Sequence, residues 1–375
     1  MQQLDSSLEI NNTNLNTENI EKLFKKDIYM SASKVDKFYQ CRFSYFLNYI
    51  LKLKSTKPAE IDVINRGTIV HYVLERILPI FKEKNFIFQD NEVENLVDKF
   101  MSDYLYSFDT KILFEDNKFL YIFNKIKKLI IRTAYRLIDE FANTTTFRPE
   151  FFEFSIGQDI PPLTIKGENN IVINGSIDRV DIDCINGQKY VRIIDYKSGE
   201  LKFNLNKVLY GLNLQMLIYL YAFVKNNINT IPAGVFYLPV NGGYSATNNS
   251  MKMNGILVDD SDIRLSMDLQ NDNKYIPTLP RDKYRKDNPL INIDDFNTIF
   301  NFLELKIKEM EDTLLKGDIS ISPVNLGNGT SCKYCDYKNI CKIENDSKVV
   351  KINNNPNSKE ALDIMKEKIN ELQTN

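Results

Sequence analysis

Alternation of apolar and polar residues is clearest between Gly175 and Gly199, in the stretch GSIDRVDIDCINGQKYVRIIDYKSG. The dipeptide Asn186-Gly187 divides it, and Asn-Gly favours the two-residue type I′ turn of a β-hairpin. With that turn, residues facing each other across the strands have numbers that sum to 373. Val180 then faces Ile193 within an apolar face, which specifies the register of the predicted hairpin.

Apolar residues recur at helical spacing through much of the remaining chain. They predict helices at residues 31–49, 66–84, 93–107, 118–143, 205–224, 294–315 and 359–372. Strand composition occurs at residues 151–157, 233–240 and 253–257. We therefore expect an α/β fold, a small mixed β-sheet flanked by helices. Its expected divisions are a flexible lead-in at 1–28, one domain at 29–345, and a polar tail with a short amphipathic helix at 346–375.

The hairpin register brings acidic residues together. Asp178 falls opposite Asp195, and Lys197 lies on the same face because it is two residues further along the strand. Like charges directly opposite each other are destabilising, so this arrangement calls for a cation. Two carboxylates and a lysine at D…D-x-K spacing suit phosphodiester hydrolysis, with Mg²⁺ or Mn²⁺ on the carboxylates and the lysine orienting water. The alternative is a surface hairpin with solvated charges.

Other polar residues near this stretch are open to two interpretations. On the opposite face Asp181 meets Arg192, which we interpret as an ordinary cross-strand ion pair. Glu153 precedes the hairpin in a strand-like stretch and can join a metal site. His71 is the single histidine and lies in a predicted helix, where such a residue is more often packed or at the surface than a ligand.

The helix predicted at residues 205–224 is apolar on nearly all sides, which indicates deep burial. Gln215 and Tyr219 are its polar exceptions, one turn apart on one face. Because buried polar side chains need partners, the pair indicates either an internal hydrogen-bond network or a face turned to a nucleic-acid backbone.

Composition narrows the possible functions. The chain has 375 residues, 43% hydrophobic and 26% charged, as in ordinary soluble globular proteins. It contains no apolar run of membrane-spanning length and no signal-peptide pattern, so we expect a cytoplasmic protein. The net charge of −2 means that a nucleic acid has to be held in a local groove or with another subunit. Without a G-x-x-x-x-G-K-[ST] motif, we expect no ATPase activity from this chain.

Three cysteines, Cys332, Cys335 and Cys341, have C-x2-C-x5-C spacing. In a cytoplasmic chain such clustering suggests metal binding rather than disulfides. A fourth ligand is needed, and Cys41 is a better candidate than Cys184, which lies within the hairpin. Four thiolates suit either tetrahedral zinc or a 4Fe–4S cluster.

Several of these stretches together resemble the RecB-like branch of the PD-(D/E)XK nuclease superfamily, and most closely the AddB-type nuclease domain with its iron–sulfur cluster. The resemblance covers roughly residues 20–345. It rests on S-x-S…YQCRFSYFLNYILKLK, GTIVHYVLE, GSIDRVD, IIDYKSG, LQMLIYLYAF, PAGVFYLPV and SCKYCDYKNIC. One cysteine before the nuclease core and three after it is the most specific part of this pattern.

The resemblance implies a restriction-endonuclease-like core and assigns roles to individual residues. The implied metal ligands are His71, Asp178 and Asp195, with Lys197 catalytic. Gln215 and Tyr219 fall in a family motif that we assign to DNA binding. The implied 4Fe–4S ligands are Cys41, Cys332, Cys335 and Cys341. The implied activity is Mg²⁺-dependent exonucleolytic cleavage of DNA, with single-stranded ends supplied by an AddA-like helicase–nuclease partner, in recombinational repair of double-strand breaks.

Two departures leave other interpretations open. Arg42 follows the first cysteine where the family usually has proline. The chain also lacks a helicase-like portion, as expected of a truncated subunit or a free-standing relative. The alternatives are a CRISPR-associated RecB-like nuclease, a nuclease-silent iron–sulfur scaffold that binds DNA, and a zinc-clamped structural domain. PAGVFYLPV and the long lead-in favour the AddB type, and the D…D-x-K set argues against a silent scaffold.

Overall fold

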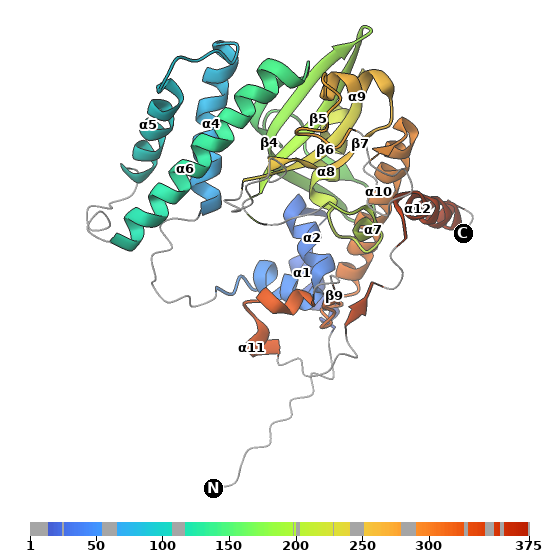
Figure 1. The fold of residues 1–375 in the computed structure, drawn as a ribbon. Helices are drawn as coiled ribbons and strands as arrows, with labels where there is room; N and C mark the ends of the chain where they lie inside the picture. Colours follow the sequence, from blue (N-terminus) through green and yellow to red (C-terminus); the bar gives the residue numbers. More distant parts are fainter. Residues whose placement is uncertain are drawn as a thin grey trace.

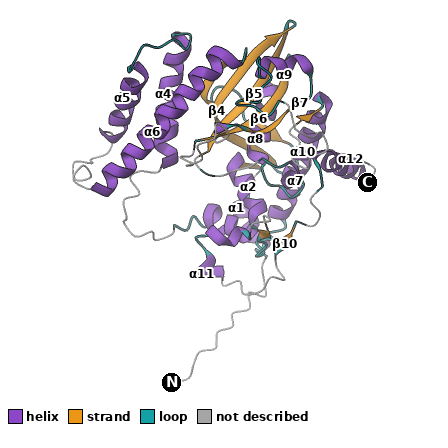
Figure 2. Ribbon diagram, in the orientation of Figure 1, coloured by secondary structure: helices purple, strands orange, loops and turns teal. Residues whose placement is uncertain are grey.

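A mixed eight-stranded sheet forms the centre of the fold (Figures 1 and 2). The computed structural model describes residues 14–24, 26–54, 66–106, 117–197, 199, 203–227, 229–240, 251–278, 290–325, 329–341, 349–352 and 356–373. The strand order is β1-β4-β5-β6-β7-β8, with β2 and β3 also paired to β4. The strands are β1 Asp27–Ser31, β2 Arg148–Ile156, β3 Leu163–Ile165, β4 Asn170–Ile185, β5 Gln188–Lys197, β6 Thr230–Pro239, β7 Asn254–Val258 and β8 Leu290–Ile291. The mixed α/β architecture is as expected, although the sheet is larger.

The β4–β5 hairpin has the predicted register. Asn186 and Gly187 have φ values of 53° and 80°, as a type I′ turn requires. Val180 pairs with Ile193, and Asp181 pairs with Arg192. Local sequence was therefore sufficient to predict the register of this hairpin.

Helices surround the sheet (Figure 1). They are α1 Thr17–Leu23, α2 Ala32–Gln40, α3 Arg42–Tyr45, α4 Arg66–Glu83, α5 Glu92–Tyr106, α6 Asn117–Asp139, α7 Leu205–Val208, α8 Leu214–Asn226, α9 Ser261–Met267, α10 Ile293–Leu315, α11 Lys338–Cys341 and α12 Ser358–Gln373. Short π-helical turns follow α3 (η1, Phe46–Ile50) and α6 (η3, Glu140–Thr144), and a 3₁₀ turn, η5, spans Ser331–Tyr334. A two-stranded sheet pairs β9 (Val324–Asn325) with β10 (Val350–Lys351). None of the described helices has the length and apolar character needed to cross a membrane.

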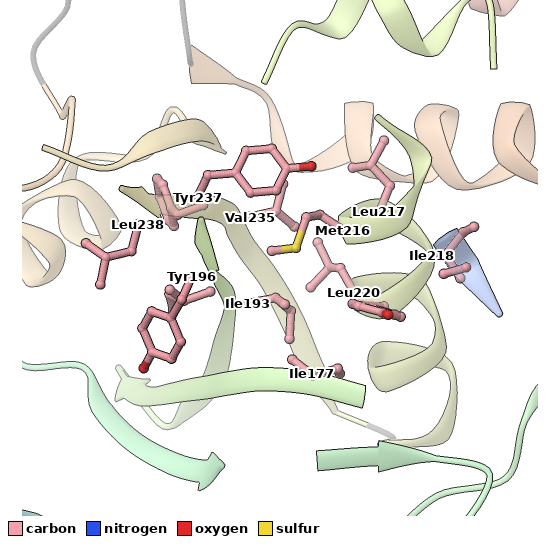
Figure 3. Packing of buried hydrophobic residues seen from close by; sticks show 14 of the residues in the cluster. Ile177, Ile193, Tyr196, Met216, Leu217, Ile218, Leu220, Val235, Tyr237 and Leu238 are labelled. Carbon is pink, nitrogen blue, oxygen red and sulfur yellow. The ribbon is translucent and has the colours of Figure 1, made fainter. Parts of the chain in front are cut away.

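Helix α8 covers one face of the central strands. Figure 3 shows Ile193 of β5 pointing toward Met216 and Leu220 of α8, whereas Tyr196 points away from this helix. Because side chains alternate along a strand, Asp195 and Lys197 lie on the same face as Ile193. The predicted catalytic face is therefore the face that α8 covers.

Two predicted helices are interrupted. The helix expected at 31–49 stops at Cys41, whose φ of −174° is extended, before α3 begins. The helix expected at 205–224 breaks between α7 and α8, where Gly211 has a φ of 77°. A side chain at Gly211 would place its Cβ 2.1 Å from the ring of Tyr39, so a tertiary contact selects glycine there.

Both chain ends contribute more structure than the sequence suggests. Residues 1–13 of the expected lead-in lie outside the described residues, but α1 follows, and β1 pairs in parallel with β4. In the expected polar tail, α12 packs against α10 and buries Ala361 and Met365 completely. The predicted amphipathic helix is confirmed, and its apolar face joins the main core.

Candidate functional site

The strands of the hairpin separate at the two opposed aspartates. The β4–β5 ladder ends with Arg179 opposite Ile194, beyond which β5 remains paired with β6 and β4 with β2. We call this point of separation the fork. Asp178 and Asp195 are the next residues of β4 and β5 beyond the last pair of the ladder. They lie close enough that the charge of Asp178, together with burial, raises the pKa of Asp195.

His71, near the start of α4, lies beside Asp178. Its Nδ1 is 3.4 Å from Asp178 Oδ1, and its Nε2 is 3.0 Å from the carbonyl oxygen of Tyr196. The Tyr196 N–H in turn donates to Asp178 Oδ2 at 2.7 Å. Burial disfavours a charged imidazole, but hydrogen bonds to Asp178 and Glu153 outweigh it and raise the pKa of His71 to about 10. Both ring nitrogens therefore act as donors here.

Glu153 of β2 completes a group of three. Its Oε1 is 3.8 Å from His71 Nδ1, and its Oε2 accepts a hydrogen bond from Ser176 at 3.1 Å. Its φ of 46° is rare outside glycine. The β2–β4 register on either side of it places Glu153 opposite Asp178. Within the described part of the chain, one group of His, Cys, Asp or Glu side chains has all its ligand atoms within 4.8 Å of one another: His71, Glu153 and Asp178.

Asp195 lies at the edge of this group. The expected ligand set grouped Asp195 with His71 and Asp178. In the structure Asp195 is ion-paired to Lys197 instead, with 2.6 Å between Asp195 Oδ2 and Lys197 Nζ. Burial raises the pKa of Asp195 to about 7, as does the charge of Asp178, although Lys197 and His71 act against them. A divalent cation between the two aspartates would offset the part of this shift in pKa that the charge of Asp178 causes.

Gln215 and Tyr219 also face the fork. Gln215 Nε2 donates to the Tyr219 hydroxyl at 3.2 Å, which is the internal hydrogen bond considered from sequence. The Tyr219 ring packs on Gly175 of β4, where an added Cβ would lie 2.5 Å from Cε1. Burial raises the pKa of Tyr219 to about 12, and the charges of Asp195 and Asp178 add to the shift. The pair therefore lies beside the carboxylates.

Four cysteines line one pocket, although the chain separates the first from the others by almost 300 residues. Cys41 is buried at the end of α2, Cys332 and Cys335 come from η5 and the residue after it, and Cys341 ends α11. Burial raises the pKa of the Cys332 thiol, with Cys41 and Cys335 nearby. Cys184 is exposed on β4 and does not line the pocket.

Comparison with known proteins places this geometry in a family. Residues 29–342 match the model of the PD-(D/E)XK nuclease superfamily. The chain belongs to this superfamily. Its curated relatives include proteins named as the B-type subunit of an ATP-dependent helicase/deoxyribonuclease. The relative from Clostridium botulinum strain Langeland is 30% identical over 90% of this chain, and that from Clostridioides difficile is 29% identical over 94%. The matches cover 32% and 33% of those relatives, so the chain spans about a third of their length.

The letters of the superfamily name fit the fork. The residue types of Asp178 and of Asp195-Tyr196-Lys197 match the D and the (D/E)-x-K of that name. PD-(D/E)XK nucleases use divalent metal ions, and the His71 group offers donors that suit such an ion: two carboxylates and one imidazole. Glu153, only a weak candidate from sequence, is part of that donor set because the β2–β4 register places it opposite Asp178.

Metal binding at this site is expected to release protons. His71 has to lose a proton to become a ligand, and its pKa of about 10 means that it is protonated at neutral pH. Affinity for Mn²⁺ should therefore rise between pH 6 and pH 9, by at most about tenfold per pH unit for one proton released. Calorimetry in buffers of different ionisation enthalpy measures the Mn²⁺ affinity and the number of protons released. A pH dependence of affinity that is unchanged in the matched His71→Ala variant would contradict proton release by His71.

The opposite face of the hairpin corrects one interpretation. Asp181 does bind Arg192, at 2.9 Å, but neither residue is at a surface. Arg179 lies 2.8 Å from Asp181, and Glu140 of η3 lies 2.8 Å from Arg192. Arg136 of α6 pairs with Glu140. The pair is thus part of a buried cluster of three arginines and two carboxylates, because α6 and η3 cover this face.

Proposed function

We propose that this chain is the nuclease domain of an AddAB-type helicase–nuclease and hydrolyses DNA phosphodiesters with Mg²⁺ in double-strand break repair. The observation that carries the proposal is the fork, where Asp178, Asp195 and Lys197 converge with His71 and Glu153. The names and the match of the curated relatives support DNA as substrate and an AddA-like protein as partner. They favour this function over a CRISPR-associated nuclease.

Each side chain at the fork has a separate role in the proposed reaction. His71, Asp178 and Glu153 would hold the metal ion, with Asp195 across the fork from Asp178 as a further carboxylate ligand. When bound, a divalent ion lowers the pKa of water and stabilises charge on the phosphate. Lys197 places a positive charge beside Asp195, where it orients the water and offsets charge that develops on phosphate oxygens. The Tyr196 N–H holds Asp178 in the orientation that this arrangement needs.

The direct test is a cleavage assay on the whole chain, purified without oxygen. We expect Mg²⁺-dependent degradation of single-stranded DNA, weak binding of DNA by the chain alone, and no ATP hydrolysis. Asp178→Asn is the inactive control, and chelation should abolish cleavage. Absence of cleavage by a folded protein that binds Mn²⁺, or full cleavage by Asp178→Asn, would refute the proposal. The former result favours the nuclease-silent scaffold.

The cysteine pocket is proposed to hold a 4Fe–4S cluster. Four thiols in one pocket provide the complete donor set. The resemblance to the AddB-type nuclease domain, with one cysteine before the core and three after it, favours iron–sulfur over zinc. The cluster would be structural, tying the start of the domain to its end.

Single serine substitutions test the cluster. Cys41→Ser, Cys332→Ser, Cys335→Ser and Cys341→Ser should each lose iron and visible absorbance and lower the melting temperature, because four thiolates hold the cluster. Cys184→Ser, which changes an exposed thiol, is the matched control and should keep its iron, its absorbance and its melting temperature. Iron analysis of the five proteins measures the outcome. Full iron content in Cys41→Ser, or zinc in place of iron in the unaltered chain, would contradict the assignment.

A further inference from the structure

Helix α8 begins without a cap from its own sequence. Its N-cap residue, Asn213, has a φ of 60°, and its side chain forms no capping hydrogen bond. The Asn213 Oδ1 accepts instead from the N–H of Asn204 at 3.3 Å. The first N–H groups of a helix need acceptors from outside it. Asp36 of α2, 178 residues earlier, supplies one, since its Oδ1 accepts from the Leu214 N–H at 2.8 Å.

The carboxylate of Asp36 is held at the helix end by several groups. Burial raises the pKa of Asp36 to about 7, whereas hydrogen bonds from the Leu214 and Gln215 amides, and the charge of Lys197, lower it. An acceptor with negative charge also complements the positive end of the helix dipole. Asp36 thus contacts the first turn of α8 and lies within electrostatic reach of Lys197. Figure 1 shows α2 directly below the sheet that carries the fork.

The first turns of α8 determine where its polar face lies. Gln215 is the second residue of the helix, and Tyr219 follows one turn later. The Tyr219 ring is held between Gln215 and Gly175, three residues before Asp178. A shift of the first turn therefore moves both polar side chains relative to the carboxylates.

We propose that Asp36 is a positioning residue of the active site: by capping α8 from another segment, it places Gln215 and Tyr219 beside the fork. The proposal rests on the proposed nuclease function for its catalytic consequence. Asp36 contacts neither the candidate metal group nor DNA in this role. Its loss should therefore affect turnover and leave metal affinity unchanged.

Three variants of the whole chain separate these effects. Asp36→Ala removes the acceptor and should lower the single-turnover rate by roughly ten- to a hundredfold, as expected when reacting groups are misplaced. Asp36→Asn keeps a side-chain oxygen and should restore most of that rate. Asp260→Ala removes the cap of α9, where Asp260 accepts from the N–H groups of Asp262 and Ile263, and should leave the rate unchanged. Mn²⁺ affinity should be the same in all three.

Two further readouts decide the outcome. In a double-mutant cycle, the losses from Asp36→Ala and Gln215→Ala should not multiply if Asp36 acts through Gln215. Amide hydrogen exchange at Leu214 and Gln215 should rise in Asp36→Ala and not in Asp260→Ala. Three results would each overturn this inference. They are losses in rate that multiply in the double mutant, an Asp36→Asn protein as inactive as Asp36→Ala, and unchanged hydrogen exchange at Leu214 and Gln215 in Asp36→Ala. If the unaltered chain cleaves no DNA, the proposed function fails by itself, and the exchange experiment still decides whether Asp36 holds the start of α8.

Discussion

Replacing Asp195 by asparagine is expected to lower DNA cleavage by about a thousandfold or more, because the fork loses one of the two opposed carboxylates proposed to bind the catalytic metal ion. The same substitution should raise the melting temperature of the metal-free protein at pH 8. The buried Asp195 carboxylate has a pKa raised from 3.8 to about 7, so its ionisation opposes folding. Activity and stability should therefore change in opposite directions.

The pH dependence of this stability effect has a definite sign. A carboxyl whose pKa is higher in the folded than in the unfolded chain lowers stability as pH rises between the two values. The gain from Asp195→Asn should thus be small at pH 4, grow between pH 4 and pH 7, and level off above it. Added Mg²⁺ should stabilise the unaltered protein and have less effect on the variant.

Asp183→Asn is the matched control on the same hairpin. Asp183 lies opposite Tyr190 and accepts a hydrogen bond from Thr146, far along the strand from the fork. We expect neither its cleavage rate nor its metal dependence to change. Calorimetric scans with and without chelator, beside single-turnover rates, measure both properties. A thermally weakened yet active Asp195→Asn protein would remove Asp195 from the site.

The parts of the site that could be predicted are those specified by neighbours in sequence. The Asn186-Gly187 turn and the alternation around it determine the hairpin register, and the register places Asp178 opposite Asp195. The fork itself could not be predicted, because the hairpin sequence does not show where the β4–β5 ladder ends while β2 and β6 continue along the outer edges of the two strands. Glu153 became a clear candidate only through the pairing of β2 with β4, which places it opposite Asp178 and which local composition does not indicate.

The positions at which helices end were also only partly predictable from neighbouring residues. Apolar periodicity predicted the long helices α4, α6 and α10, which fold nearly as expected. It failed between α7 and α8, where a break is stabilised by the Tyr39 ring against Gly211 and by the Asp36 carboxylate. Both contacts come from a segment almost 180 residues away, so no pattern within the helix reports them.

The buried charges of the hairpin's other face predict the largest loss of stability. Asp181→Ala should lower the free energy of unfolding by about 3–5 kcal/mol, since it leaves Arg179 and Arg192 buried without their shared carboxylate. Burial disfavours the ionised Glu140 carboxyl, but the charges of Arg136 and Arg192 hold its pKa below the usual range. One carboxylate cannot balance three guanidinium groups, so Glu140 does not replace Asp181.

Urea unfolding of Asp181→Ala measures this loss. Asp183→Ala, two residues along the same strand and outside the cluster, is the control and should change stability by less than about 1 kcal/mol. Domains are stable by only about 5–15 kcal/mol, so this loss removes a large part of the stability of the protein. Its folded fraction should still cleave DNA, because Asp181 points away from the fork. An unchanged unfolding midpoint would mean that buried water or movement of the arginine side chains replaces the missing charge.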